Sequence, residues 1–255
     1  MHRETSVHER ENEALLHEIG LIYADHNGTY GYRRIADEYN ETHEKKYNLK
    51  RFYRLTSLAN IKAVIRRKRS RYRQSTPEIT AENILDRDFC ANRPNEKWLT
   101  DVTEMKCASG EKLYLSAILD LKCKDIVSFA MGRSNNNALV FKTFDAAKDK
   151  YPDANPIFHS DRGFQYTSKT FHQKLTEANM TQSMSRVGRC IDNGPMEAFW
   201  GILKSEMYYL RQFSTYEELE TAIHEFIHYY NYKRRQRRLQ KMAPMNYRKL
   251  LDCSA

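Results

Sequence analysis

The hydrophobic pattern of this chain changes near residue 97, and this change constrains the fold more than any other feature. Three apolar segments with strand-like character, 97–107, 112–121 and 125–133, follow one another with only short turns between them. Helix-like and strand-like segments then alternate to about residue 232. Three successive strands followed by alternating helices and strands predict an α/β fold, with a mixed sheet that carries helices on its faces.

The later elements can be placed from their periodicity and their end signals. An Asp192 or Asn193 cap with Pro195 in the first turn predicts the start of a long helix. We expect helices over 138–151, 168–179, 192–210 and 216–235, and strands over 155–161 and 181–186.

The first part of the chain is patterned differently. Helical spacing over 4–24, 32–39 and 49–61, with a glycine-marked turn after the first segment, predicts a small all-α unit. The third segment carries Lys50 and Arg54, as expected of a helix-turn-helix type DNA binder. Small helical bundles that bind no DNA share this pattern, so that alternative stays open.

Charge is concentrated in two segments. The chain has a net charge of +9, yet 61–75 holds seven basic and no acidic residues, and 233–249 holds eight basic and no acidic residues. The rest is mildly acidic. Unopposed basic runs of this density favour a polyanionic partner over an ordinary solvated surface. We therefore expect a helical DNA-binding module at 1–74, a linker at 75–92, a catalytic core at 93–232 and a basic C-terminal tail at 233–255.

Several classes of protein are excluded by what the sequence lacks. No apolar run approaches the length of a membrane span, and the N-terminal residues lack a signal-peptide core, which predicts a cytoplasmic protein. The five cysteines form no CxxC pair, which argues against a disulfide scaffold or a cysteine zinc site. No phosphate-binding GxxxxGK[ST] loop is present, so nothing indicates ATP chemistry.

Three carboxylates occupy positions where a catalytic sheet presents ligands. Asp101 lies within the first strand, Asp161 follows the fourth strand directly, and Glu197 falls in the first turn of the long helix. Each acid alone is ordinary capping chemistry. Gathered at one sheet edge, they would repel one another unless cations neutralised them, and hard oxygen ligands suit Mg²⁺ or Mn²⁺. Two such ions could drive an in-line phosphoryl displacement. Lys204, seven residues after Glu197, shares its helix face and is placed to hold a phosphate.

Longer stretches carry a family resemblance. Fifty-nine residues separate Asp101 from Asp161, and 35 separate Asp161 from Glu197. This spacing, with NEKWLTDVTEM, HSDRGFQYTS, DNGPMEAFWGILKSEM and FIHYYNYKRRQRRLQKMAPMNY, resembles retroviral integrases and the DDE transposases of bacterial insertion sequences. The chain is most similar to the second-frame (OrfB) products of elements with two overlapping reading frames. The YGYRRI helical module ahead of the core belongs to the same resemblance.

The resemblance implies an RNase H-like core that performs metal-dependent cleavage and strand transfer at element ends. It maps Asp101, Asp161 and Glu197 onto the family's catalytic trio, and Lys204 onto a frequent basic position. It also implies double-stranded DNA as substrate, a homo-oligomer of at least two chains on DNA, and a first-frame (OrfA) protein or fusion as partner, all at the nucleoid. The basic side chains from which we expect DNA contacts are Lys204, Arg33, Arg34, Lys50, Arg51, Arg54, Arg66, Arg67, Arg234 and Arg235.

Other sequence features give weaker evidence of function. His224 and His228 fit HExxH, but a zinc protease needs a third ligand that the sequence does not supply in the usual place, so exposed helical histidines are the favoured interpretation. His159 is more readily a packed strand residue than a metal neighbour, and Asp120 either supports the site or serves a turn. Two other functions stay open: a DNA-binding regulator without catalysis, and a general RNase H-type nuclease.

Overall fold

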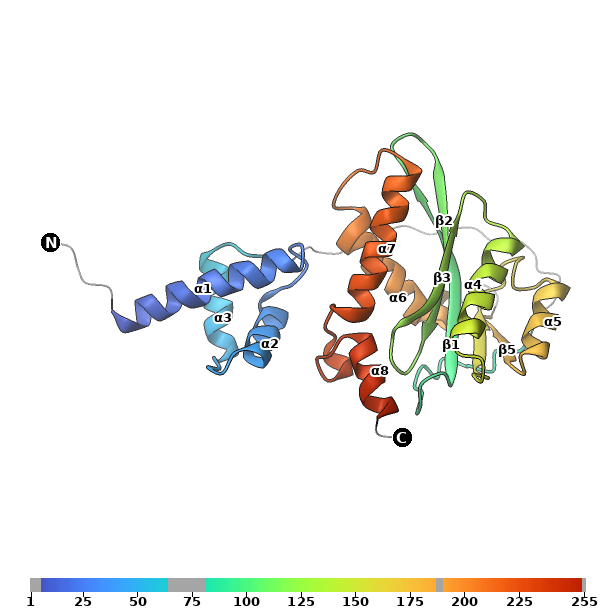
Figure 1. Ribbon diagram of the computed structural model, residues 1–255, viewed down its shortest axis with the longest axis horizontal. Helices are drawn as coiled ribbons and strands as arrows, with labels where there is room; N and C mark the ends of the chain where they lie inside the picture. The colour runs from blue at the N-terminus through green and yellow to red at the C-terminus, as the bar shows by residue number, and fades with distance from the viewer. Residues whose placement is uncertain (1–5, 64–80, 187–189, 254–255) are drawn as a thin grey trace. The chain divides into compact units, whose positions relative to one another are not determined.

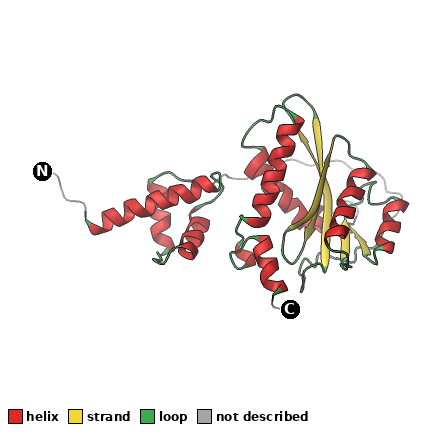
Figure 2. Ribbon diagram, in the orientation of Figure 1, coloured by secondary structure: helices red, strands yellow, loops and turns green. Residues whose placement is uncertain are grey.

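The computed structural model describes residues 6–63, 81–186 and 190–253, and these form two compact units, one up to Arg67 and one from Lys68 onward. The basic residues Arg66 and Arg67 lie outside the described residues. Figure 1 shows helices only in the first unit, whereas the second contains a sheet with helices on both faces (Figures 1 and 2).

The first unit is a three-helix bundle. Its helices are α1 (Val7–Asp25), α2 (Tyr32–Thr42) and α3 (Leu49–Leu58), as the apolar spacing predicts. Buried Leu15, Ile19, Ile35 and Phe52 hold the three helices together. The turn after α1 contains Gly28 at φ +72°, a left-handed conformation that side chains rarely adopt.

The second unit is built on a five-stranded mixed sheet of order β3-β2-β1-β4-β5. The strands β1 (Lys97–Lys106), β2 (Lys112–Asp120) and β3 (Ile126–Gly132) form the expected antiparallel meander. The strands β4 (Ile157–Ser160) and β5 (Thr181–Met184) add to β1 in parallel. The mixed α/β sheet predicted from the sequence is confirmed.

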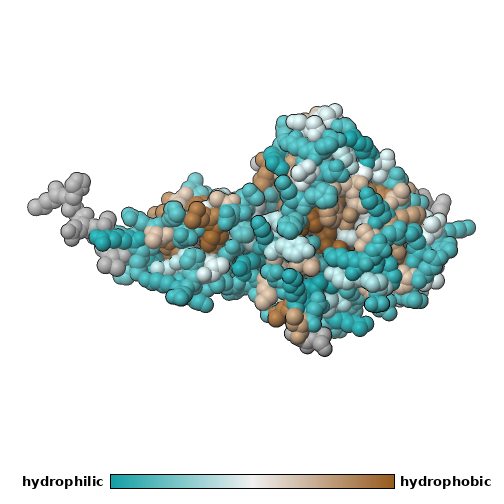
Figure 3. Space-filling model, in the orientation of Figure 1, coloured by the Kyte–Doolittle hydropathy of each residue, from teal (hydrophilic) through white to brown (hydrophobic). Residues whose placement is uncertain are grey.

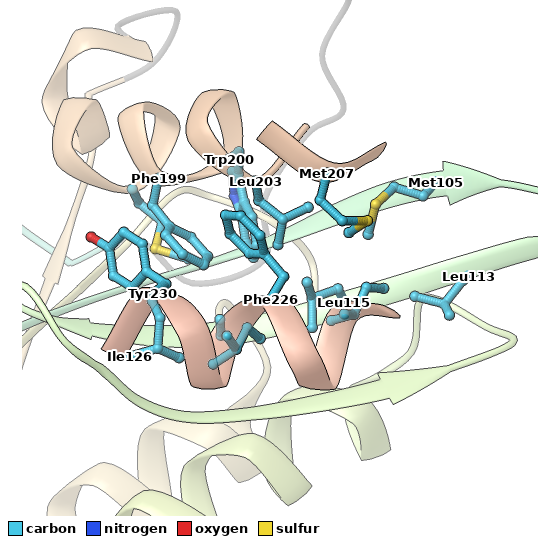
Figure 4. Close-up of a cluster of buried hydrophobic side chains, with 14 of the residues drawn as sticks. Met105, Leu113, Leu115, Ile126, Phe199, Trp200, Leu203, Met207, Phe226 and Tyr230 are labelled. Carbon is cyan, nitrogen blue, oxygen red and sulfur yellow. The ribbon is translucent and has the colours of Figure 1, made fainter. Parts of the chain in front are cut away.

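Helices cover both faces of this sheet and define two cores. On one face, α4 (Asn137–Lys150) and α5 (Lys169–Glu177) enclose Trp98 and Phe158. On the other, α6 (Gly194–Leu203) and α7 (Tyr216–Tyr232) enclose a larger cluster, in which Trp200 is seen beside Leu203 (Figure 4). Alternate residues of β1 therefore face different cores.

Two segments differ from the sequence prediction. The helix expected over 192–210 begins as a 3₁₀ turn at Cys190–Asn193 and ends as a π-type turn at Lys204–Tyr208, so only its middle is α-helical. The π turn redirects Tyr208, whose hydroxyl donates to the Lys106 carbonyl and accepts from the Lys106 amide. The segment expected as a basic tail is folded, with a 3₁₀ turn (Arg237–Leu239) and helix α8 (Pro244–Asp252).

The surface is largely hydrophilic in the view of Figure 3. Among the described residues, no helix combines the length and apolar character that crossing a membrane demands.

Candidate active site

The register of the sheet brings the two aspartates together. The strands β1 and β4 run parallel, and Leu99 of β1 pairs with His159 of β4. Asp101 in β1 and Asp161 after the end of β4 each lie two residues beyond that pair. They therefore occupy corresponding positions on neighbouring parallel strands. The carboxyl end of a parallel strand, where Asp161 follows β4, is where open α/β sheets present ligands.

Burial changes the protonation of both aspartates, and nearby negative charges add to the effect at Asp101. Asp101 is half-buried, and its loss of water contact, with the negative charges of Asp161 and Glu197, raises its pKa to about 7. Burial also raises the pKa of Asp161. The phenol of buried Tyr166 feels both aspartates, and its pKa rises well above the usual range through burial and their charges. Asp101 on β1 is therefore acted on by the negative charges of Asp161 at the end of β4 and of Glu197 on α6.

Asp101 and Asp161 accept hydrogen bonds from uncharged N–H groups. Asp101 accepts from the Val102 amide at 2.8 Å and from the indole N–H of Trp200 at 2.9 Å. Asp161 accepts from the Gly163 amide at 2.9 Å. These donors orient the carboxylates without neutralising them.

Glycine at position 163 follows from this close approach. A Cβ there would lie 3.0 Å from the Asp161 carboxylate oxygen and 2.9 Å from the Gln165 side-chain oxygen. Side chains at 163 would therefore displace the carboxylate that the backbone amide holds.

Asp192 and Asn193, one of which was expected to cap the helix, hold the start of α6 through side-chain contacts with other segments. Asp192 is buried and accepts from the guanidinium groups of Arg87 and Arg186, at 2.7 Å and 3.0 Å from Nε, which lower its pKa. Asn193 donates from Nδ2 to the Thr100 carbonyl, next to Asp101, instead of capping the helix with its side chain. Glu197 follows one turn later, so its position depends on both residues.

A second acidic group in the same unit is already occupied by an arginine. Asp120, Cys123 and Asp125 offer ligand atoms within 4.8 Å of one another, and all three are buried. The Arg248 guanidinium fills this group, donating to Asp125 at 2.8 Å and lying 3.4 Å from Asp120. A cation there would have to displace another cation. Asp120 therefore serves the turn after β2, where it also accepts from the Cys123 amide.

The histidines weighed from the sequence have ordinary surroundings. His159 is fully buried, its ring nitrogens hydrogen-bonded to the Ser183 and Ser185 hydroxyl groups, and burial lowers its pKa to about 4. His224 and His228 are exposed on α7. The geometry therefore favours a packed strand histidine at position 159 and exposed helical histidines at positions 224 and 228.

The predicted DNA-contact residues divide into exposed and internal groups. Lys50 and Arg54 are exposed on α3, and Arg33 is exposed on α2. Arg34 is half-buried, and its guanidinium lies over the Tyr30 ring. Lys204 is half-buried at the first position of the π turn.

Three arginines are engaged within the fold, contrary to what their sequence context suggests. Arg234 is buried, and its guanidinium donates twice to Glu206, at 2.6 and 2.7 Å. Arg51 donates to Asn12 and Glu11 across the helical unit. Arg235 donates to the Lys241 carbonyl. The structure thus corrects the assignment of Arg234 to a DNA surface, because a basic run does not show which members turn inward.

Comparisons with known proteins agree with this geometry. Family profiles described as "Integrase core domain" match residues 91–190 and 197–250, and an "HTH-like domain" profile matches residues 9–69. The catalytic core domain of the HTLV-2 integrase, solved with magnesium, superposes with a TM-score of 0.50 at 18% identity, covering 62% of this chain and 99% of that one. This likeness confirms the RNase H-like fold class.

Relatives extend over most of the chain. The InsK protein for insertion sequence element IS150 of Escherichia coli K12 is 41% identical over 231 residues, which are 90% of this chain and 81% of that protein. The transposase for element IS904 of Lactococcus lactis is 32% identical over 252 residues, 98% of this chain and 99% of the relative. A transposase-like protein of Haemophilus influenzae is 43% identical over 203 residues, 80% and 94% of the two chains. The chain therefore belongs to the insertion-sequence transposases, the family in which a helix-turn-helix-like domain precedes an integrase core.

Proposed function

We propose that Asp101, Asp161 and Glu197 bind two divalent cations, Mg²⁺ or Mn²⁺, and that the chain uses them to cut DNA at the ends of its element and join the ends to target DNA. The observation that carries this proposal is the electrostatic environment of Asp101, whose pKa is raised to about 7 by burial first and then by the negative charges of Asp161 and Glu197. Such a cluster costs stability in the fold unless cations complete it.

The residues would act by position and charge. Bound metal ions would activate a water or a 3′-hydroxyl and stabilise the leaving oxygen of an in-line displacement. Val102, Trp200 and Gly163 hold the carboxylates of Asp101 and Asp161 in fixed orientations. Lys204, one residue after α6, would hold a phosphate near the scissile bond.

The helical unit would supply sequence recognition. Lys50, Tyr53, Arg54 and Ser57 are exposed and recur at helical spacing along one face of α3. This face replaces the one inferred from charge alone, because Arg51 turns toward Glu11 and Asn12. We place α3 in the major groove, with the helical DNA-binding module at 1–74, a linker at 75–92, the core at 93–232 and the C-terminal segment at 233–255.

Joining two element ends needs more than one active site, so the working complex would be at least a dimer of this chain on DNA. A first-frame protein or fusion would add further end recognition. A transposase acts where bacterial DNA is, which places the protein in the cytoplasm at the nucleoid.

The test is a cleavage and joining assay with the full chain on labelled element-end DNA, with Mg²⁺ or Mn²⁺ or with EDTA. The proposal predicts metal-dependent nicks at the element end and joined products. Binding without nicking, also in the presence of the first-frame protein, would instead indicate a regulator. Sequence-independent cutting of RNA–DNA hybrid without joining would indicate a general nuclease.

Metal binding is expected to depend on pH in a defined direction. Because the pKa of Asp101 is raised to about 7, the metal-free fold keeps a proton there that the unfolded chain loses near its ordinary pKa. This contribution to stability is present at low pH and is lost as pH rises through about 7. Mg²⁺ must displace the proton below pH 7, so the increase in Tm on adding Mg²⁺ should be larger at pH 8 than at pH 5.5. Equal increases at both pH values would contradict the assignment.

Removing the exposed charges of α3 is expected to weaken DNA binding. The double variant Lys50→Ala with Arg54→Ala should bind element-end DNA less tightly. The negative slope of log K against log salt should become shallower by about 0.9 for each phosphate that the variant no longer neutralises. Fluorescence anisotropy at several salt concentrations measures both the affinity and the slope. Lys46→Ala, exposed in the loop before α3, is the matched control. Unchanged affinity and slope in the double variant would exclude this face of α3 as the DNA-binding surface.

A further inference from the structure

Trp200 lies at the junction of the two elements that carry Asp101 and Glu197. It belongs to α6 and is 6% exposed, among the side chains that fill the space between α6, α7 and the sheet (Figure 4). Burial alone would make it a core residue. Its indole N–H, however, is not directed into the apolar cluster, because it donates to Oδ2 of Asp101 at 2.9 Å.

Helical spacing connects this bond to Glu197. Glu197 and Trp200 are three residues apart on α6 and therefore occupy neighbouring positions on one helix face. The negative charge of Glu197 acts on the same Asp101 carboxylate that accepts from Trp200. One face of α6 thus presents a neutral donor and an acid to Asp101.

The hydrogen bond fixes the orientation of the carboxylate while leaving it able to bind a cation. Oδ1 of Asp101 accepts from the Val102 amide and Oδ2 from Trp200, so each oxygen has one donor. A carboxylate has about four lone-pair sites, so each oxygen retains acceptor capacity. Val102 belongs to β1 and Trp200 to α6, so the carboxylate is held from both elements.

We propose that Trp200 is a positioning residue that couples α6 to the metal-binding carboxylate of Asp101, so that binding of a divalent cation at Asp101 and the seating of Glu197 depend on one indole hydrogen bond. This inference rests on the proposed function, because it assumes that Asp101 binds the cation. Hydrogen-bonding partners of metal ligands commonly contribute ten- to a hundredfold in metal affinity.

The chain offers an internal control. Its only other tryptophan, Trp98, is fully buried and lies on β1, three residues before Asp101. It faces the core between the sheet and α4 and α5, and its indole N–H donates to Asn95 at 3.3 Å. The two indole groups thus report on opposite faces of the sheet.

The experiment records the indole N–H resonances of the full chain labelled with ¹⁵N-tryptophan. Trp200→Phe and Trp98→Phe each remove one resonance and so assign both. Asp101→Asn is expected to shift the Trp200 resonance and leave that of Trp98 in place, and Mg²⁺ added to the wild-type chain is expected to do the same. A Trp200 resonance that responds to neither change overturns the inference, and this readout does not require the Trp200 variant to fold.

A second readout separates positioning from packing. The Mg²⁺ concentration that gives half of the maximal increase in Tm should rise about ten- to a hundredfold in Trp200→Phe, and it should not change in Trp98→Phe. An unchanged midpoint in Trp200→Phe, with a Tm lowered as in Trp98→Phe, reduces Trp200 to a packing residue. The proposed function fails separately, through absence of metal-dependent nicking by the wild-type chain, because the response to Asp101→Asn involves neither metal nor DNA.

Discussion

Asp161→Asn is expected to lower metal-dependent nicking of element-end DNA by roughly a thousandfold or more. An amide is a neutral and weaker ligand for a hard cation than a carboxylate, and metal-ion stabilisation of a phosphoryl transition state is worth several kcal/mol, at about 1.4 kcal/mol for each tenfold in rate. The local fold should persist, because the asparagine oxygen can still accept from the Gly163 amide that now binds Asp161. Gel quantification of nicked product over time measures the rate.

Two controls make this result specific. DNA binding by Asp161→Asn should be at least as tight as that of the wild type, since the substitution removes a negative charge and alters no residue of the DNA-binding helix. Glu104→Gln alters an exposed acid of β1 that lies 3.2 Å from Lys112, and it should nick DNA at the wild-type rate. Loss of nicking and binding together in Asp161→Asn, or retained nicking, would count against the assigned role of Asp161.

The second large effect is on stability. Arg248→Leu is expected to lower the free energy of unfolding of the catalytic unit by about 3–5 kcal/mol, because it removes the cation between two buried acids. Arg248 of α8 is 3% exposed and contacts Asp120 and Asp125, whose side chains are fully buried. One oxygen of Asp125 already has no hydrogen-bond partner in the wild type, so no other donor compensates this carboxylate for the loss of Arg248. Urea unfolding followed by circular dichroism measures the change.

The pH dependence of this variant identifies the cause. Burial raises the pKa of Asp125 and Arg248 opposes that rise, so removing Arg248 lets the pKa rise further. A raised carboxyl pKa contributes stability at low pH that is lost as pH increases, so the deficit of Arg248→Leu relative to the wild type should shrink as pH falls. Lys249→Leu, exposed at the next position of α8, should change stability little. A deficit that is equally small in both variants would show that the acids do not depend on Arg248.

Much of the catalytic unit was predictable from the sequence because its signals are local. Alternating apolar residues predicted the strands, and helical spacing predicted the helix over 168–179 that the structure shows as α5. The three acids could be placed on their elements from the sequence because Asp101 lies within a strand pattern, Asp161 follows one and Glu197 follows a helix start. Their proximity needed the parallel pairing of β1 with β4, which periodicity does not encode.

The features missed by sequence reasoning are contacts between distant segments. Trp200 is buried like a core residue, but its hydrogen bond to Asp101 joins residues 99 positions apart. The spacing of three residues from Glu197 was the available signal. The inward turn of Arg234 and Arg248 was hidden for a similar reason, because their partners Glu206 and Asp125 lie far away in the sequence.

The most direct test of the central claim is whether Asp161 itself binds the catalytic cation. Asp161→Cys substitutes a thiolate, which binds the hard Mg²⁺ ion poorly but is a better ligand for the transition-metal ion Mn²⁺. The measurement is the ratio of nicking rates in Mn²⁺ and in Mg²⁺ for the wild type, Asp161→Cys and Asp161→Ser. The account predicts that only Asp161→Cys loses nicking in Mg²⁺ and recovers it in Mn²⁺. If Asp161→Cys is equally impaired in both ions, so that its ratio of nicking rates equals those of the wild type and Asp161→Ser, the account is contradicted.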